Sequence, residues 1–504
     1  MTKAIMVQGT MSNAGKSILT AALCRIFKQD GYKTAPFKSQ NMALNSFVTR
    51  DRLEMGRAQA TQAEAAGVDP DVRMNPILLK PVHDSGSQVI VNGEVFGTVA
   101  ARDYYAMKQM LKPKIMEAYH SLAADFDVIV LEGAGSPAEL NLARDDFVNM
   151  GMAKIANAPV LLVGDIDRGG IFPQIYGTVK LLPADERALI KATIVNKFRG
   201  DMSLFDEGVK ILEKLCGIPC AGVVPMLDVD IEDEDSLSER LTRRRMDPVI
   251  DIAVIGMPHI SNFTDFTALQ ATPGVGLRYV GDASDLGTPD FIILPGTKNT
   301  IGDLIRLREC GLEAEIKRLA AQGAAVVGIC GGFQMLGERV TDRDGVEGAT
   351  GRSIAGMTLL PVTTEFSADK HRAQVSAAVL KVDGVFAPLS GKSVEGYEIH
   401  MGVSERAPGA APLLRLSSGA LDGCQKGNVY GTYLHGFFDG AECRGAICSA
   451  LAEAKGVKLP APAFDFAEYK NRQYDLLAAG VRNALNMPLI YQILDKIGSR
   501  PFGS

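Results

Sequence analysis

Short apolar runs recur along the chain, and longer stretches between them repeat apolar positions at helical spacing. Short runs bounded by Gly, Pro or polar residues are typical of buried strands, and amphipathic stretches are typical of helices. The pattern predicts strands at residues 4–7, 34–38, 77–81, 87–91, 126–131, 159–163, 192–195, 250–255, 277–280, 291–294 and 324–329. It predicts helices at residues 18–28, 54–66, 103–123, 441–454, 467–486 and 488–497. This alternation predicts an α/β fold with mostly parallel sheets covered by helices on both faces.

The length of 504 residues exceeds what one ordinary core supports, so we expect two or three domains. Residues 228–247 are charged and poor in apolar side chains, which is typical of a solvated loop. A charged surface helix within one domain is the alternative. We expect an N-terminal domain at 1–227, a charged linker at 228–248, a second domain at 249–445 and a C-terminal helical segment at 446–504.

The composition is that of a globular protein, with 46% hydrophobic and 22% charged residues. The net charge of −6 includes no basic region, which argues against nucleic acid as the main partner. No apolar run reaches the length of a membrane span, and the N-terminus runs straight into a strand, so we expect no membrane contact and a cytoplasmic location. The eight cysteines are scattered, and Cys216 and Cys220 lack a second pair to complete a zinc site.

A phosphate-binding loop follows the first predicted strand. The stretch Gly9–Ser17 lies between that strand and a helix and ends in Gly-Lys-Ser. In such loops the backbone N–H groups hold phosphates, the Lys reaches the terminal phosphates, and the Ser hydroxyl binds Mg²⁺. Gly9 lies one residue too early for the standard spacing, and a chance Gly-Lys-Ser turn is the alternative. The predicted ATP contacts in this loop are Gly9, Thr10, Ser12, Asn13, Ala14, Gly15, Lys16 and Ser17.

Polar residues also follow other predicted strands of this half. Glu132 comes directly after a buried strand and before Gly133, so its carboxylate can reach a metal held by Ser17. We therefore expect Ser17 and Glu132 to bind Mg²⁺, with a helix-capping acid as the alternative for Glu132. Lys38 ends another strand, and its position fits a surface cation as well as a ligand contact.

The Gly-Thr loop with one extra residue before Gly-Lys-Ser is similar to that of the dethiobiotin synthetases, which activate a carboxylate with ATP. This resemblance implies that Lys38 contacts phosphates and the substrate carboxylate. It also implies that Asn196, in an Asn-Lys pair after a strand, lies near the nucleotide base. Arg199 replaces the Asp of the guanine-reading Asn-Lys-x-Asp pattern, which favours ATP over GTP.

In the second half, Cys330 follows the apolar run 324–329 and stands between Gly328 and Gly332. This is the nucleophile-elbow pattern with Cys in place of Ser, in which a sharp strand-to-helix turn presents the side chain at a helix N-terminus. A buried Cys in a Gly-rich loop is the alternative. The Pro-Gly turn after the preceding strand offers an amide, from Gly296 or Thr297, that would form an oxyanion hole together with the Gly331 N–H.

A cysteine nucleophile needs a base, and the chain contains six histidines. We favour His435, which lies past a strand at a Gly turn, far enough from Cys330 in sequence to be a spatial partner. His400 is the rival. It alternates like a strand residue and would otherwise be structural or line the substrate pocket.

The pattern Gly-x-Cys-Gly-Gly-x-Gln-x-Leu-Gly, with a later Gly-Thr-x-x-His-Gly, resembles the class I glutamine amidotransferases. These enzymes hydrolyse L-glutamine through a γ-glutamyl thioester and release ammonia. Familiar members carry a Glu two residues after the His, where this chain has Phe437. That departure matches the branch to which only a Cys and a His are assigned, so the resemblance leaves open what orients His435.

Together the halves imply an ATP-dependent amide ligase. A free carboxylate does not react usefully with ammonia, phosphorylation supplies a leaving group, and a dry route keeps ammonia from becoming ammonium. The whole chain resembles the cobyric acid synthases. The stretches that carry this resemblance are 8–10, 14–17, 36–46, 56–60, 75–81 and 396–400, of which Asn41–Ser46 is the most specific.

The resemblance implies amidation of the b, d, e and g carboxylates of adenosylcobyrinic acid a,c-diamide, with one glutamine and one ATP for each. The cofactors and partners are then ATP, Mg²⁺, L-glutamine and a corrinoid, and no feature of the sequence indicates an oligomeric state. Two alternatives stay open. One is a related ligase, such as an a,c-diamide synthase or a cell-wall precursor amidase, and the other is a P-loop switch ATPase with a degenerate amidotransferase used for binding.

Overall fold

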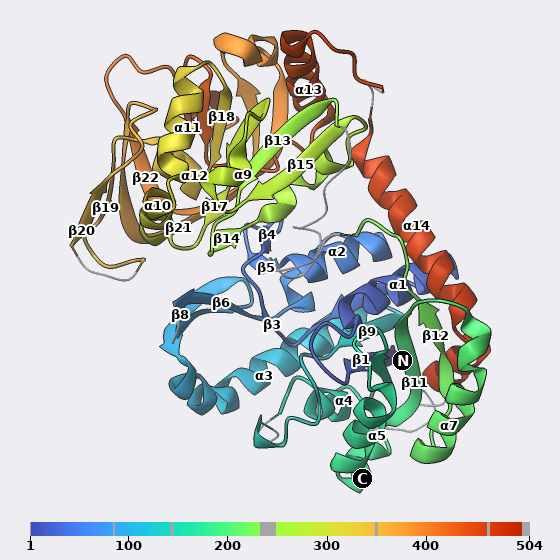
Figure 1. Cartoon of the computed structure of the whole chain (residues 1–504). Coiled ribbons are helices and arrows are strands. Elements are labelled where there is room, and N and C mark those ends of the chain that lie inside the picture. Colours follow the sequence, from blue (N-terminus) through green and yellow to red (C-terminus); the bar gives the residue numbers. More distant parts are fainter. Residues whose placement is uncertain are drawn as a thin grey trace.

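The computed structural model describes residues 2–83, 86–142, 146–231, 248–347, 351–460 and 464–495. Two α/β bodies lie one above the other, and a long C-terminal helix runs from the upper body down the side of the lower one (Figure 1). Most of the predicted linker, residues 232–247, lies outside the described residues. No helix in the described part of the chain is both long enough and apolar enough to span a bilayer.

The N-terminal body is built on a six-stranded sheet in the order β12-β11-β10-β1-β9-β2, with every neighbouring pair parallel. Its strands are β1 (Lys3–Gly9), β2 (Thr34–Phe37), β9 (Val128–Glu132), β10 (Val160–Asp165), β11 (Ile190–Phe198) and β12 (Cys220–Pro225). Successive residues of β1 pack in different cores, Ala4 and Met6 on one face and Ile5 and Val7 on the other. Burial on both faces is what a parallel sheet requires, and it explains why these strands are continuous apolar runs.

Helices cover both faces of this sheet: α1 (Lys16–Gln29), α2 (Arg57–Ala66), α3 (Ala101–Asp125), α4 (Met150–Ile155), α5 (Ile171–Leu181), α6 (Ala184–Arg187) and α7 (Asp206–Cys216). The helix predicted at 54–66 begins only at Arg57. Residues Glu54–Gly56 form strand β5 instead, because they pair with β4 (Ser46–Val48) in an antiparallel hairpin.

A small second sheet stands beside the main one and carries the order β3-β6-β7-β8. Its strands are β3 (Gln40–Met42), β6 (Ile77–His83), β7 (Gly86–Val91) and β8 (Glu94–Ala100). Together with the β4–β5 hairpin, it lies on the side of the lower body that faces the upper body (Figure 1). The Ser46 end of the specific run Asn41–Ser46 contacts the upper body, because its N–H donates a 3.2 Å hydrogen bond to Asn262.

The C-terminal body has a six-stranded sheet in the order β15-β13-β16-β18-β26-β25, antiparallel only at its last pair. The strands are β13 (Ile250–Ile255), β15 (Val275–Val280), β16 (Phe291–Leu294), β18 (Ala325–Ile329), β25 (Cys424–Lys426) and β26 (Val429–Thr432). The helices are α8 (Thr267–Ala271), α9 (Ala283–Leu286), α10 (Thr300–Glu309), α11 (Leu312–Ala321), α12 (Gly331–Leu336) and α13 (Ala441–Lys455).

A seven-stranded sheet that the sequence pattern did not predict completes this body. Its centre is the long antiparallel pair β21 (Val362–Val379) and β22 (Ser393–Arg406). The other strands are β19 (Arg339–Asp342), β20 (Arg352–Ala355), β23 (Leu414–Leu416), β24 (Leu421–Asp422) and β27 (Leu434–His435). Half-exposed positions interrupt the apolar pattern of β22, so these strands carry a weak hydrophobic signal.

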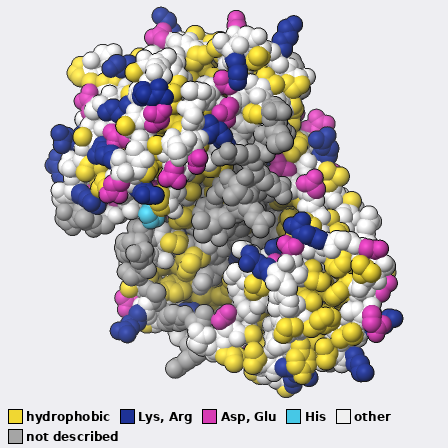
Figure 2. All heavy atoms as spheres, in the orientation of Figure 1, with side chains coloured by type: hydrophobic (Ala, Val, Ile, Leu, Met, Phe, Trp, Pro, Cys, Tyr) yellow, Lys and Arg dark blue, Asp and Glu magenta, His cyan; other side chains and the backbone are white. Residues whose placement is uncertain are grey.

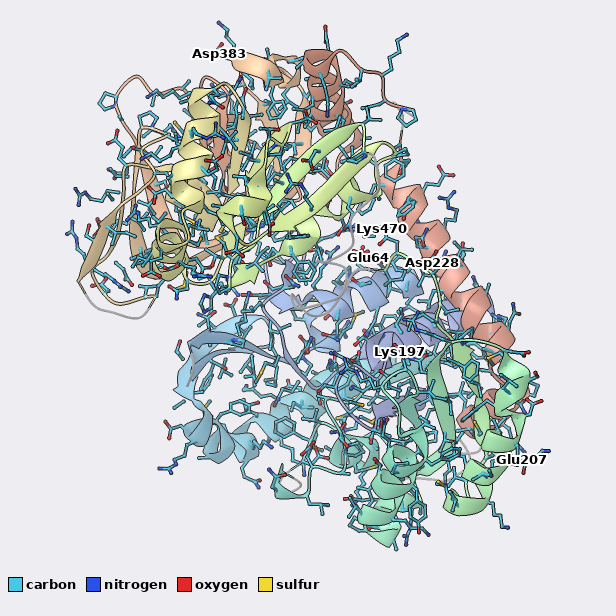
Figure 3. All side chains as sticks on the ribbon, in the orientation of Figure 1. Glu64, Lys197, Glu207, Asp228, Asp383 and Lys470 are labelled. Atoms are coloured by element: carbon cyan, nitrogen blue, oxygen red, sulfur yellow. The ribbon has the colours of Figure 1, made fainter. Side chains whose placement is uncertain are left out.

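The predicted C-terminal segment 446–504 is divided between the two bodies. Helix α13 packs in the core of the upper body, whereas α14 (Phe466–Ala484) and α15 (Met487–Asp495) complete a core of the lower body. Lys470 of α14 forms an ion pair with Glu64 of α2, and the two residues are labelled side by side in Figure 3. The chain therefore returns to its N-terminal half after finishing the second body.

The described surface mixes charges of both signs over the face drawn in Figure 2, while apolar side chains gather on the lower body. The exposed apolar residues of α5, α7 and the turn before α7 are Tyr176, Leu181, Met202, Leu204, Ile211 and Leu215, with Leu204 82% exposed. An apolar group of this kind exceeds the scattered single residues of an ordinary surface.

The return of α14 predicts a stability difference between neighbouring leucines. Leu477 is fully buried against α1, whereas Leu476 is 50% exposed. We expect Leu477→Ala to lower the free energy of unfolding by about 2–4 kcal/mol because it leaves a cavity, and Leu476→Ala to change it by less than about 0.5 kcal/mol. Urea denaturation monitored by circular dichroism measures both. Equal effects of the two substitutions would contradict the packing of α14 on the lower body.

Candidate active sites

Cys330 lies on a sharp turn between β18 and α12. Its backbone has φ +51° and ψ −110°, a conformation that costs energy in a residue with a side chain. The neighbouring glycines are needed for space. A Cβ at Gly328 would lie 2.6 Å from the Gly332 carbonyl carbon, and a Cβ at Gly332 would collide with the Leu294 carbonyl oxygen. The geometry is that of the predicted nucleophile elbow.

His435 lies on β27 and is 1% exposed. Its Nδ1 is 2.7 Å from Oδ2 of Asp265, a residue that is itself 4% exposed. The other Asp265 oxygen accepts a hydrogen bond of 3.2 Å from the Gly436 N–H, which fixes the carboxylate beside the ring. Asp265 therefore orients His435 and fills the role that the sequence left open.

The charges around His435 determine its protonation. Burial alone lowers the pKa of His435, but the Asp265 carboxylate and a hydrogen bond with Cys330 outweigh burial and raise that pKa to about 10. An imidazolium stabilised in this way can act as a general acid beside the cysteine. Cys330, His435 and Asp265 thus form a Cys-His-Asp arrangement.

Sequence reasoning missed Asp265. Asp265 lies on a short 3-10 turn, Phe263–Phe266, and precedes His435 by 170 positions. In the familiar pattern the third residue instead follows the His. Its only sequence signal is an acid in a short stretch between phenylalanines, and that signal does not identify a partner.

The predicted oxyanion-hole residues meet at the same place. Gly296 and Thr297 form β17, which pairs with β14 (Ile260–Ser261). A Cβ at Gly331 would lie 3.0 Å from the Thr297 nitrogen, and a Cβ at Gly296 would lie 3.3 Å from Cε1 of His435. All three residues therefore surround the Cys330–His435 pair.

The rival histidine, His400, has a structural environment. Its ring stacks on Tyr433 at 3.8 Å, and Nδ1 donates a 2.7 Å hydrogen bond to the Gly402 carbonyl. Burial lowers the pKa of His400 to about 4, so the ring is neutral near pH 7. Of the two candidates, His435 is the one paired with a carboxylate and with Cys330.

A second candidate site lies at the carboxyl ends of the strands in the lower body. Lys16 begins α1, and its Nζ donates to the carbonyl oxygens of Met11 at 3.0 Å and Gly135 at 3.2 Å. A Cβ at Gly9 would lie 3.1 Å from the Lys16 stem. The early glycine therefore leaves room for the lysine side chain, which gives a physical reason for the unusual spacing.

Glu132 is the centre of this site and is 1% exposed. Its Oε1 accepts hydrogen bonds of 2.8 Å from both Ser17 Oγ and Lys38 Nζ, and its Oε2 accepts one of 2.6 Å from Gln62. Lys38 is 3% exposed, so it is not a surface cation. A hydroxyl, a carboxylate and a lysine beside a phosphate-binding loop form a set that can hold a metal–phosphate complex.

The donor set suits Mg²⁺ rather than a transition metal. The described residues contain no group of three His, Cys, Asp or Glu side chains that could hold a metal alone. Mg²⁺ is commonly bound by one or two protein oxygens and by substrate phosphates, so Ser17 and Glu132 fit this ion.

Asn196 holds the phosphate-binding loop. Its Nδ2 donates a 2.9 Å hydrogen bond to the Ala14 carbonyl, and a Cβ at Gly15 would collide with this amide. The next residue, Lys197 (Figure 3), donates to the Asn13 carbonyl at 2.6 Å and to Asp165 at 2.9 Å. The Asn-Lys pair therefore fixes the loop from the neighbouring strand β11.

The Asp265–His435 contact predicts a shift in pH dependence. Asp265→Asn removes the charge that stabilises the imidazolium, so the pKa of His435 falls and the alkaline limb of the glutamine-hydrolysis profile moves to lower pH. We expect kcat/KM at neutral pH to fall on the order of 10²-fold. A pH series of kcat/KM measures both effects. An unchanged alkaline limb would show that Asp265 does not set the protonation of His435.

Comparisons with known proteins assign each half of the chain to a domain family. Residues 5–237 match the family described as CobQ/CobB/MinD/ParA nucleotide binding domain. Residues 251–443 match the family described as CobB/CobQ-like glutamine amidotransferase domain. These matches confirm the predicted fold class, a P-loop α/β domain followed by an amidotransferase-like α/β domain.

Several curated relatives match almost the whole chain, and each is named cobyric acid synthase. The one from Ruminiclostridium cellulolyticum is 55% identical and covers 98% of both chains. The one from Lachnoclostridium phytofermentans is 53% identical and covers 98% of this chain and 100% of its own. The relative from Yersinia enterocolitica is 49% identical and covers 98% of both chains. The chain therefore belongs to the cobyric acid synthase family and is a glutamine-hydrolysing carbon–nitrogen ligase.

Proposed function

We propose that this chain amidates the b, d, e and g carboxylates of adenosylcobyrinic acid a,c-diamide and yields adenosylcobyric acid in the cytoplasm. One observation supports the proposal most strongly. A single chain of this family contains both a Cys-His-Asp group and a phosphate-binding loop with Lys38 and Glu132. One group releases ammonia and the other activates a carboxylate to receive it. Each amide would consume one glutamine and one ATP.

Ammonia release begins at Cys330. The thiolate attacks the side-chain carbonyl carbon of glutamine, and the Gly331 N–H with that of Gly296 or Thr297 stabilises the oxyanion. The imidazolium of His435 donates its proton to the leaving nitrogen as the thioester forms. His435 then accepts a proton from the water that hydrolyses the thioester to glutamate, while Asp265 keeps the ring in place.

Carboxylate activation takes place at the phosphate-binding loop. A corrinoid carboxylate oxygen attacks the γ-phosphorus of ATP and releases ADP, which converts a poor leaving group into phosphate. Lys16 and Lys38 contribute positive charge beside the transferred group. Ser17 and Glu132 would hold Mg²⁺, which neutralises phosphate charge when bound. Ammonia then attacks the carbonyl carbon of the acyl phosphate, and phosphate leaves.

The two-site reaction predicts that nitrogen sources can be separated by mutation. Cys330→Ala removes the nucleophile, so we expect glutamine-driven amidation to fall on the order of 10³-fold or more. Amidation driven by ammonium chloride should stay within about two-fold of the unmodified protein, because the phosphate-binding site is untouched. Chromatography of the corrinoid products under each nitrogen source measures this. Loss of both activities, or persistence of the glutamine-driven one, would contradict the proposal.

If Glu132 binds the metal, its substitution should reduce the ATP-dependent reaction and leave glutamine hydrolysis intact. Glu132→Gln keeps the shape of the side chain but removes its charge, so we expect ATP-dependent amidation to fall on the order of 10²-fold and to require more Mg²⁺. Glutamine hydrolysis should continue and reports that the variant is folded. Initial rates measured across a Mg²⁺ titration test the assignment. An unchanged Mg²⁺ dependence would exclude Glu132 as a metal ligand.

A further inference from the structure

A buried arginine holds the turn that follows His435. Arg444 lies in the first turn of α13 and is 2% exposed. Its Nη1 donates hydrogen bonds to the backbone carbonyls of Phe438 at 3.0 Å and Asp439 at 2.5 Å. The Asp439 N–H in turn donates a 3.0 Å hydrogen bond to the Gly436 carbonyl. Arg444 therefore fixes the turn directly after His435.

The same guanidinium also binds the segment that leads into α14. Its Nη2 donates a 2.5 Å hydrogen bond to the Phe464 carbonyl. The guanidinium carbon of Arg444 lies 5.3 Å from the centre of the Phe464 ring and 6.0 Å from that of Phe466, which is the range of cation–π contacts. Phe466 packs in a buried cluster with two alanines of α8. Through this ring, Arg444 supports the helix that begins two residues after Asp265.

A contact between aromatic rings joins the two supported segments. Phe266, the neighbour of Asp265, and Phe438 have ring centres 6.1 Å apart, and both belong to the core of the upper body. The polar contact between the same segments is the 2.7 Å pair of Asp265 Oδ2 and His435 Nδ1. The geometry of that pair therefore depends on how the two segments pack, and Arg444 binds both of them.

Keeping a charge at this position costs free energy. Burial lowers the pKa of Arg444, and the negative charges of Asp439 and Asp465 offset burial only in part. The hydrogen-bond partners of this guanidinium among the described residues are backbone carbonyls. An apolar side chain of similar length would avoid the penalty. What the guanidinium adds is direction, because one planar group with fixed donors binds two chain segments at once.

We propose that Arg444 is a positioning residue that sets the contact between Asp265 and His435 by fixing the two segments that carry them. The inference rests on the proposed function, since it needs His435 to serve in glutamine hydrolysis. Arg444 acts through the turn after His435 and the helix after Asp265, and not on glutamine itself. A misplacement of about 1 Å at a reacting group can lower a rate on the order of 10²-fold, so a residue outside the site can control catalysis.

Arg444→Met tests the proposal, because it keeps an unbranched apolar side chain and removes every donor. We expect kcat for glutamine hydrolysis to fall on the order of 10-fold and KM for glutamine to stay within about two-fold. A looser contact with Asp265 lowers the pKa of His435, so the alkaline limb of the kcat/KM profile should move to lower pH. Amidation driven by ammonium chloride should stay within about two-fold.

A double-mutant cycle separates positioning from a general loss of packing. If Arg444 acts through Asp265, then Arg444→Met should change kcat by less than about two-fold in a protein that already carries Asp265→Asn. The other titratable groups that face His435 are Cys330 and His400, and both are unchanged in these variants. Arg444→Lys retains one charged donor for the turn, so it should restore part of the lost rate.

Arg278→Met is the matched control. Arg278 lies on β15 of the same body, and its side chain is 14% exposed. It donates to Asp251 and to two backbone carbonyls at the end of α9, so it is also a largely buried arginine that holds a turn. We expect its substitution to lower the midpoint of urea denaturation and to leave both kcat and the alkaline limb unchanged.

Three results would overturn the proposal. One is an unchanged kcat and alkaline limb in Arg444→Met, or in Arg444→Lys if the methionine variant does not fold. Another is a full further loss when Arg444→Met is added to Asp265→Asn, which would show that Arg444 acts elsewhere. The third is an equal shift in Arg278→Met, which would attribute the effect to stability. Glutamine hydrolysis that persists in Cys330→Ala would instead contradict the proposed function, and it is distinguishable from all three.

Discussion

A buried carboxylate shared by two lysines joins the two halves of this protein. Burial alone would raise the pKa of Glu54, but Lys370 from the upper body and Lys80 from the lower one hold it well below its usual range. Removing one partner from such a group leaves an unpaired charge in the interior, which costs about 3–5 kcal/mol. Val48 packs with Tyr397 and Ile399 next to it, so polar and apolar contacts fix the same junction. Lys80 also donates to Ser46 Oγ at 2.8 Å, and the Ser46 N–H donates a 3.2 Å hydrogen bond to Asn262, which lies 3.5 Å from the His435 ring nitrogens.

Each candidate site follows from the same property of parallel sheets. The carboxyl ends of neighbouring strands share one edge, so loops that are distant in sequence meet there. In the lower body this edge brings Lys16, Lys38 and Glu132 together, from the ends of β1, β2 and β9. In the upper body it brings Gly331, which follows Cys330 at the end of β18, next to Thr297 at the end of β16. The antiparallel pair β21–β22 then supplies Tyr397, which stacks on His435 and reaches Ser46 in the other body.

What the sequence predicts well is local. The turn around Cys330 and the loop before Lys16 depend on glycines a few positions away, so a short pattern identifies them. Asp265 could not be found in this way, because its partner His435 lies 170 positions later and on a different element. Lys38 was ambiguous for a similar reason, since only the fold shows that it faces Glu132. Contacts between distant segments also determine the β21–β22 sheet and the return of α14 to the first body. Hydrophobic periodicity carries no information about such contacts.

Mass spectrometry of the corrinoid product tests the central claim most directly. The protein would be incubated with adenosylcobyrinic acid a,c-diamide, glutamine, ATP and Mg²⁺. The account predicts that four carboxylates become amides, with one glutamate and one ADP formed for each. An unchanged corrinoid, in a preparation that hydrolyses both glutamine and ATP, would contradict the assigned substrate and would leave an amide ligase acting on another acid.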